Sequence, residues 1–266
     1  MTIEQDVTTD QDMTAEQTDL SQEKAVMANQ EHIAVLELGC GAWREWRKNN
    51  PDVVPELRGA ELDKMDLSGM DLHDADLREA SLKLANLREA NLRNANLAGA
   101  DLREADVRAA DLTDAVLSKA DLRSTDFRKA VLETAHLSAA NLDGAYLDAV
   151  DLSDADLSRA RLVNAGLKNA DLCGANLRKA NLRKADLRKA KLRKANLHGV
   201  DLRKANLGGA DLRKVNLSGA NLSGANLRNT RLTKANVSKA DMHGTDLRKA
   251  NVRGTDLNAA KGIKKA

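Results

Sequence analysis

The sequence predicts an all-β solenoid, in which the chain winds a four-sided coil about ten times behind a short α-helical cap at the N-terminus. Three observations predict it. Leucine or a similar apolar residue stands at every fifth position from 57 to 257, 41 times without a gap. Aromatic residues make up only 2% of the chain, so leucine and alanine must fill the core. Both prolines, Pro51 and Pro55, precede the first of these leucines, so the repeat keeps every backbone donor.

The first segment, residues 1–27, is acidic and rich in Thr, Gln, Asp and Glu, a composition typical of disorder. The chain starts with polar and acidic residues rather than with basic and then apolar ones. No stretch approaches the roughly 18 consecutive apolar residues of a membrane span. The sequence therefore predicts neither a secretory signal nor a transmembrane helix, and we expect a cytoplasmic protein.

Residues 28–56 are predicted to form a helical cap and lead-in. Four apolar residues at or beside helical spacing are expected to pack on the coil: Ile33, Leu36, Trp43 and Trp46. Pro51 and the two asparagines before it end the helix. Gly39 and Gly41 weigh against one continuous helix. Because the end of a stack of coils exposes unpaired backbone groups, the helix is expected to cover the first coil.

Residues 57–260 hold the repeat, and its period excludes straight elements. A small residue precedes each apolar position by two places, Ala at 31 of 41, and Asp or Asn precedes it by one at 30. An α-helix advances about 100° per residue, so a five-residue period spreads leucine around its whole surface. A straight strand sends leucines five apart to opposite faces. The chain must therefore turn within every repeat, and four repeats close one square coil. Ten coils stacked at about 4.8 Å make a rod about 50 Å long.

Alanine and leucine are expected to point inward, with the last two residues of each unit at a corner. Representative core positions are Leu57, Leu77, Leu97, Phe127, Leu177, Leu217 and Leu257. The Asp or Asn faces outward and is expected to hydrogen-bond backbone amides at the corners. Most of the aspartates therefore have a structural explanation that does not involve catalysis.

The tandem unit A(D/N)LXX, as in ADLREASLKLANLREANLRNANL at 75–97, resembles the pentapeptide-repeat family over residues 57–260. The lead-in at 42–60 is similar to the segment before some bacterial domains of that family. The resemblance implies a right-handed quadrilateral β-helix with a Leu/Phe centre. Its best-understood members resemble B-DNA in width and charge, bind DNA gyrase or topoisomerase IV, and give quinolone resistance.

Charge is unevenly distributed along the chain. Residues 1–56 carry a net charge of −8, residues 57–165 carry −7 and residues 166–266 carry +17. A DNA mimic needs negative potential along its whole length. The basic part therefore weighs against gyrase binding over the full rod and leaves at most the acidic part for it.

Arg-Lys pairs in the basic part form a candidate polyanion-binding surface. Sorted by coil, they encircle the rod as a belt rather than a single stripe: Arg178, Lys179, Arg183, Lys184, Arg188, Lys189, Arg193, Lys194, Arg203, Lys204, Arg213 and Lys214. Such a belt attracts nucleic acid or another polyanion, with affinity that falls as salt rises. The alternative is that LRKA units multiplied by tandem duplication and only keep the rod soluble. Tyr146 is the one aromatic residue expected to face outward, whereas binders of single-stranded nucleic acid use several.

The sequence predicts no catalytic residue, no metal site and no cofactor. Its five histidines fall in different coils or in the cap, so they do not form a ligand cluster. Cys40 and Cys173 are far apart and lack a CxxC companion. We expect a non-enzymatic structural or interaction module that presents a rigid rod to a macromolecular partner, a protein in the first instance.

The tail, residues 261–266, is basic. Its lysines, Lys261, Lys264 and Lys265, are expected to deter strand pairing at the open edge of the last coil. The alternative is that this end joins a second copy. The sequence is compatible with a monomer and with an end-to-end dimer.

Overall fold

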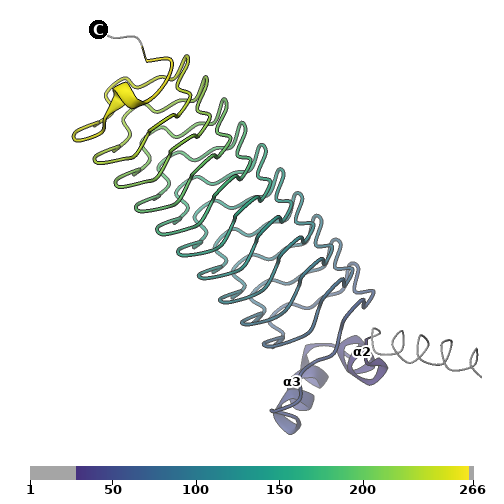
Figure 1. Ribbon diagram of the computed structural model, residues 1–266. Helices are drawn as coiled ribbons and strands as arrows, with labels where there is room; N and C mark the ends of the chain where they lie inside the picture. The colour runs from purple at the N-terminus through teal and green to yellow at the C-terminus, as the bar shows by residue number, and fades with distance from the viewer. Residues whose placement is uncertain (1–27, 264–266) are drawn as a thin grey trace, which may run out of the picture.

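The computed structural model describes residues 28–263. Figure 1 shows these residues as a rod of stacked coils, with helices at the N-terminal end and a short turn of helix near the C-terminal end. The segment predicted to be disordered, 1–27, and two of the tail lysines, Lys264 and Lys265, lie outside the described residues.

Each repeat pairs with the repeats directly above and below it in the stack. Its Asp or Asn position, here called the bridge residue, forms a parallel bridge to the residue twenty places further on, from Glu56↔Asp76 to Asp241↔Lys261. Four five-residue repeats therefore complete one coil. The extended segments are so short that each pairs through a single residue, and the described chain contains no longer strand.

Three hydrogen bonds join each pair of stacked repeats. Leu57 N–H donates to the Asp76 carbonyl and Gly59 N–H to the Arg78 carbonyl, both at 2.8 Å, while Asp76 N–H donates to the Pro55 carbonyl at 2.9 Å. The same pattern recurs along the rod. Because each bridge residue and each leucine donates in this ladder, a proline within the repeat would break it.

A tight turn after each leucine makes the corner. Ala60 N–H closes the first turn onto the Leu57 carbonyl at 3.1 Å. The second turn residue has a positive φ in every repeat from Gly59 to Gly254. These are features of a type II turn, which favours glycine at that place. Most of these residues are not glycine, and the left-handed conformation costs each of them roughly 1 kcal/mol. The ladder between coils holds them there.

Leucine and alanine fill the interior. Six of the representative core positions are fully buried: Leu57, Leu77, Leu97, Phe127, Leu177 and Leu217. Leu257 differs, because it lies in the 3-10 helix η1 (Leu257–Ala259) and is only partly buried. The last coil has no further coil above it to cover this side chain.

Two helices, α2 (Gln30–Glu37) and α3 (Cys40–Asn49), lie at the first coil (Figure 1). The chain breaks between them at Gly39, where φ is +89°. Their inward side chains are Leu36 and Trp43, which are buried in the core, and Ile33 and Trp46, which are half-buried against it.

Polar contacts fix these helices to the rod. The Trp43 indole N–H donates to the Asp71 carbonyl at 2.8 Å. Asn29 N–H donates to the Glu56 carbonyl at 2.9 Å, and Glu56 N–H donates to His32 Nδ1 at 3.0 Å. The helices therefore satisfy backbone groups that the first coil would otherwise leave open.

Candidate interaction surface

Outward Asp and Asn side chains complete the hydrogen bonding of the repeats. Four of the five backbone N–H groups in a typical repeat donate to backbone carbonyls. The fifth, on the first turn residue, donates to the side chain of its own bridge residue, as from Arg88 N to Asn86 Oδ1 at 3.2 Å and from Ser158 N to Asp156 Oδ1 at 3.0 Å. This contact is an Asx turn. It explains why the bridge position favours Asp and Asn, and it fixes where the turn residues point.

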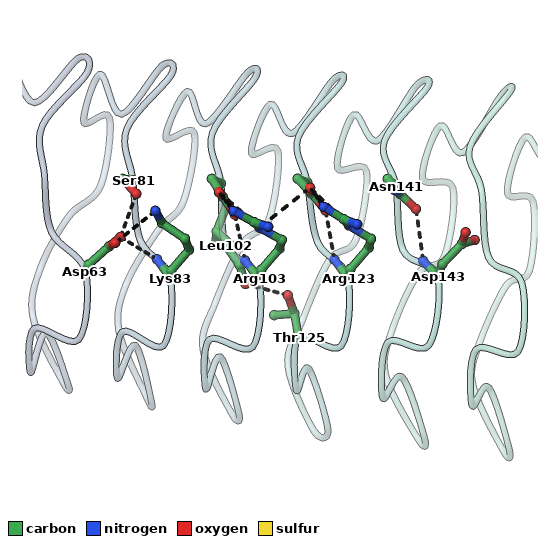
Figure 2. A network of polar contacts seen from close by, with 11 residues as sticks. Asp63, Ser81, Lys83, Leu102, Arg103, Arg123, Thr125, Asn141 and Asp143 are labelled. Atoms are coloured by element: carbon green, nitrogen blue, oxygen red, sulfur yellow. Dashed lines mark hydrogen bonds and ion pairs between the residues drawn. The ribbon is translucent and has the colours of Figure 1, made fainter.

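An arginine at the first turn position folds back onto its bridge residue when that residue is Asp. Arg103 Nη2 lies 2.7 Å from Asp101 Oδ2 and Arg123 Nη2 lies 2.6 Å from Asp121 Oδ2. Figure 2 shows both arginines in this position. Every Asp-x-Arg unit of the coil forms this ion pair: Asp76–Arg78, Asp101–Arg103, Asp106–Arg108, Asp121–Arg123, Asp126–Arg128, Asp186–Arg188, Asp201–Arg203, Asp211–Arg213 and Asp246–Arg248.

The folded-back arginines keep their carboxylates ionised. Hydrogen bonds from the guanidinium are the main reason why the pKa of Asp101, Asp106 and Asp186 is lowered. The same contact with Arg248 lowers the pKa of Asp246 to about 2. Each such pair is therefore locally neutral above the ordinary range of a carboxyl group.

The belt arginines divide into two groups by this rule. Three of them follow Asp and are paired: Arg188, Arg203 and Arg213. The other three follow Asn or Lys and form no ion pair among residues 28–263: Arg178, Arg183 and Arg193. The six belt lysines all occupy the second turn position, are exposed, and form no ion pair within the same residues. Nine of the twelve belt side chains thus keep a free positive charge.

The register of the coils determines on which side of the rod each Arg-Lys pair of the belt lies. Four successive Arg-Lys pairs, at 178/179, 183/184, 188/189 and 193/194, occupy the four sides of one coil. The pair at 203/204 lies one coil beyond 183/184, and the pair at 213/214 lies one coil beyond 193/194. The pairs are therefore spread around the rod, and two of the four sides carry a second layer.

Where the bridge residue of a repeat is neither Asp nor Asn, an aspartate of the preceding coil can accept the hydrogen bond from the first turn residue instead. Three such contacts occur: Lys83 N to Asp63 Oδ1 at 3.0 Å, Val163 N to Asp143 Oδ1 at 2.8 Å and Lys168 N to Asp148 Oδ1 at 2.8 Å. Figure 2 shows Asp63 reaching across to Lys83. Sequence reasoning missed these residues because the partners are twenty places apart. The signal in the sequence was an Asp at the first turn position, twenty places before the first turn residue of a repeat whose bridge residue is neither Asp nor Asn.

Three titratable side chains that could support catalysis each interact with the aspartate two places earlier: Cys173, His73 and His243. Cys173 lies half-buried at a corner, and burial together with Asp171 raises the pKa of its thiol, which disfavours the reactive thiolate. His73 and His243 each contact the Asp two places earlier, at 2.7 and 2.6 Å. Across residues 28–263, His, Cys, Asp and Glu side chains do not gather in groups of three that could hold a metal ion. Within the same part of the chain, no helix is long and apolar enough to cross a membrane.

The chain matches the family model "Pentapeptide repeats" in eight copies, most of which overlap. They lie at residues 56–94, 80–118, 90–128, 115–154, 140–178, 155–193, 180–219 and 220–258. Among curated proteins, no significant sequence match is found.

Several solved structures resemble the chain. HetL, a pentapeptide repeat protein involved in heterocyst differentiation regulation in the cyanobacterium Nostoc sp. strain PCC 7120, is 31% identical, with a TM-score of 0.35, over 77% of this chain and 94% of HetL. Rfr23 from the cyanobacterium Cyanothece 51142 is 29% identical, with a TM-score of 0.29, over 47% of this chain and 89% of its own. QnrB1, a plasmid-mediated fluoroquinolone resistance protein, is 18% identical, with a TM-score of 0.27, over 72% of this chain and 88% of its own.

Proposed function

Since the chain belongs to the pentapeptide-repeat family, we propose that it is a non-enzymatic interaction module, a rigid right-handed rod that presents columns of outward side chains to a macromolecular partner. The observation that carries this proposal is the fixed register. Outward residues recur twenty places apart along the rod, held by the ladder between coils. A surface ordered in advance loses little conformational entropy when a partner binds. We expect that partner to be a protein.

Affinity capture from the native host tests the proposal. The immobilised chain should retain a partner that is lost when unpaired outward charges are neutralised, as in R178Q/K179Q/R183Q/K184Q, while the thermal midpoint stays unchanged. These substitutions lie at turn positions and leave the core and the bridge residues intact. If the immobilised variant retained the same set of proteins as the immobilised unmodified chain, recognition through the outward columns would be contradicted.

Polyanion binding by the basic part is a second candidate. It is favoured by the nine belt side chains that keep a free charge, because a phosphate or sulfate group can approach them without displacing a carboxylate. Counterion release from the polyanion would make such binding strongly dependent on salt.

The belt supplies its own matched control for this candidate. R178Q/R183Q/R193Q removes three free arginines. The control D186N/R188Q/D201N/R203Q/D211N/R213Q removes three whole ion pairs, so it uncovers no carboxylate and keeps the net charge. On a heparin or DNA column the first variant should elute at clearly lower salt than the control, which should elute like the unmodified chain. An unchanged elution of the first variant, or an equal shift of both, would count against the belt as a binding site.

A further inference from the structure

One of the four sides of the rod carries more net charge, of both signs, than any other. Repeats twenty residues apart stack into four columns. We call one of them the fourth column. It comprises the repeats whose bridge residues are 71, 91, 111, 131, 151, 171, 191, 211, 231 and 251, with the two turn residues of each.

The fourth column is acidic in its first six repeats and basic in its last four. Its outward residues from 71 to 174 include eight carboxylates and one arginine, a net charge of −7. Those from 191 to 254 include eight Lys and Arg and one aspartate, a net charge of +7. No other column exceeds a net charge of three, of either sign, in the corresponding parts. The acidic charge of the first part therefore lies almost entirely on the fourth column, and this column also carries the largest share of the basic charge of the second part.

Much of this charge is available at the surface. Six turn residues of the column are exposed and form no ion pair within residues 28–263: Asp114, Glu133, Asp154, Lys194, Lys214 and Lys234. Three ion pairs of Lys or Arg with Asp do lie within the column: Arg93 with Asp111, Lys191 with Asp171, and Arg213 with Asp211. They join charges of the same column and leave its net charges as they are.

We propose that a second copy of this chain docks antiparallel along the fourth column, so that the acidic part of each copy faces the basic part of the other. A two-fold axis between the repeats at 171 and 191 sets the repeat at 191 opposite that at 171, 211 opposite 151, 231 opposite 131, and 251 opposite 111. Every basic repeat then faces an acidic one. Eight repeats at about 4.8 Å span about 35 Å.

The equal and opposite charges favour a second copy over an unrelated partner, because a two-fold contact uses the same surface twice and must be complementary to itself. A parallel pair would set like charges against each other. Since the contact depends on exposed charges, salt should weaken it strongly. This association is independent of the partner proposed above and of an end-to-end dimer.

Charge reversal tests the docking. The acid-reversed variant is D114K/E133K/D154K, and the base-reversed variant is K194E/K214E/K234E. Lys and Glu already occupy equivalent turn positions elsewhere in the coil, as at Lys64, Lys83 and Glu79, so both variants should fold. Sedimentation at about 50 mM salt should show at least tenfold weaker self-association for each variant alone, and a return of association when the two are mixed or combined in one chain.

A matched control changes the same charge on other sides. K179E/K184E/K189E alters the net charge as much as the base-reversed variant does but leaves the fourth column intact, so it should associate like the unmodified chain. The proposal is overturned if the unmodified chain stays monomeric at low salt and about 0.1 mM, since contacts of millimolar affinity carry little free energy. A mixture of reversed variants that fails to associate would overturn it as well.

Cys173 reports the geometry directly, because its repeat adjoins the two-fold axis. In the antiparallel pair the two Cys173 residues are offset by about 5 Å along the rods, whereas a dimer joined at the C-terminal coils separates them by about 40 Å. With Cys40→Ser removing the other thiol, a short bis-maleimide should cross-link two copies at low salt and not at about 1 M, where the Debye length is about 3 Å. Equal cross-linking of the base-reversed variant would contradict the docking.

Discussion

At the residue scale, the side chain at the bridge position determines both the conformation of the turn and whether the arginine two places on is paired. Its oxygen accepts the one backbone N–H that the ladder leaves over, and Asp and Asn serve equally. Only Asp then captures the arginine two places on. Three aspartates of a neighbouring coil supply the same hydrogen bond. Within residues 28–263 other repeats, such as those of Val116 and Val131, fold without it, so the contact recurs but is not obligatory.

Asp148→Ala should lower the free energy of unfolding by about 1 kcal/mol, because Lys168 N–H loses its acceptor and Gly166 offers none. Adding Gly166→Asn to that variant should restore most of the loss by supplying an Asx acceptor within the repeat. Urea unfolding followed by far-UV circular dichroism measures both. Glu133→Ala, at the same turn position but with a carboxylate that forms no hydrogen bond within residues 28–263, should change stability by less than about 0.5 kcal/mol.

Lowering the pH should destabilise the rod over a defined pH range. Carboxyls whose pKa is lowered by a folded-back arginine, such as Asp101 and Asp106, stabilise the fold fully above their ordinary value of about 4. That stability is lost as pH falls through the lowered values, of which the pKa of Asp246 is about 2. The thermal midpoint should therefore decrease between about pH 5 and pH 2.

The Asn-substituted variant D101N/D106N/D186N should show a smaller decrease, because amides do not titrate and still accept the turn N–H. Differential scanning calorimetry at a series of pH values measures the slope. A variant with the same pH dependence as the unmodified chain would show that these ion pairs do not contribute to acid sensitivity.

At the scale of the element, the helices and the first coil stabilise each other through a few contacts. Trp43 is buried, lies 4.9 Å from Trp46 between ring centroids, and donates to the Asp71 carbonyl. In stacked repeats each unit touches only its neighbours, so damage at one end stays local.

Trp43→Ala should release α2 and α3 at a cost of about 3 kcal/mol or more, while Trp43→Phe keeps most of the packing and should cost about 1 kcal/mol. Both tryptophans of the chain lie in α3, so Trp46 fluorescence follows the helices while circular dichroism at the β-sheet wavelength follows the coils. In Trp43→Ala the fluorescence transition should precede the dichroism transition. Coincident transitions would show that the rod unfolds as one unit.

Much of this architecture follows from the spacing alone. Leucines five apart, such as Leu57 and Leu62, require a turn between them, and four repeats to a coil then follow from the square cross-section. The left-handed residues were less predictable, because Lys, Glu and Asp occupy a position that an isolated turn would give to glycine. The contact of Asp148 with Lys168 depends on stacking and so could be seen only once the coil was built. The pairing of Arg188 could have been found from the Asp-x-Arg spacing.

At the scale of the whole molecule, the register decides which charges share a side. Duplicating one repeat, residues 176–180, should preserve the coil but rotate everything after it by one side. The acidic and basic parts of the fourth column would then lie on different sides. Self-association at low salt should weaken at least tenfold, with the thermal midpoint unchanged within a few degrees.

Inserting a complete coil of twenty residues at the same place provides the control. It lengthens the rod by about 4.8 Å and returns every downstream residue to its original side, so association should persist. Sedimentation of the two insertion variants side by side measures the difference. Equal association of both would show that the alignment of the two parts is irrelevant.

The equivalence of Asp and Asn at the bridge position has an evolutionary consequence. Exchange of one carboxylate oxygen for an amide NH2 releases an arginine, and the reverse exchange captures one, while the Asx turn and the buried leucine stay as they are. Evolution can therefore change the surface charge of such a rod by substitutions that keep its fold. Partner choice is then free to diverge faster than architecture.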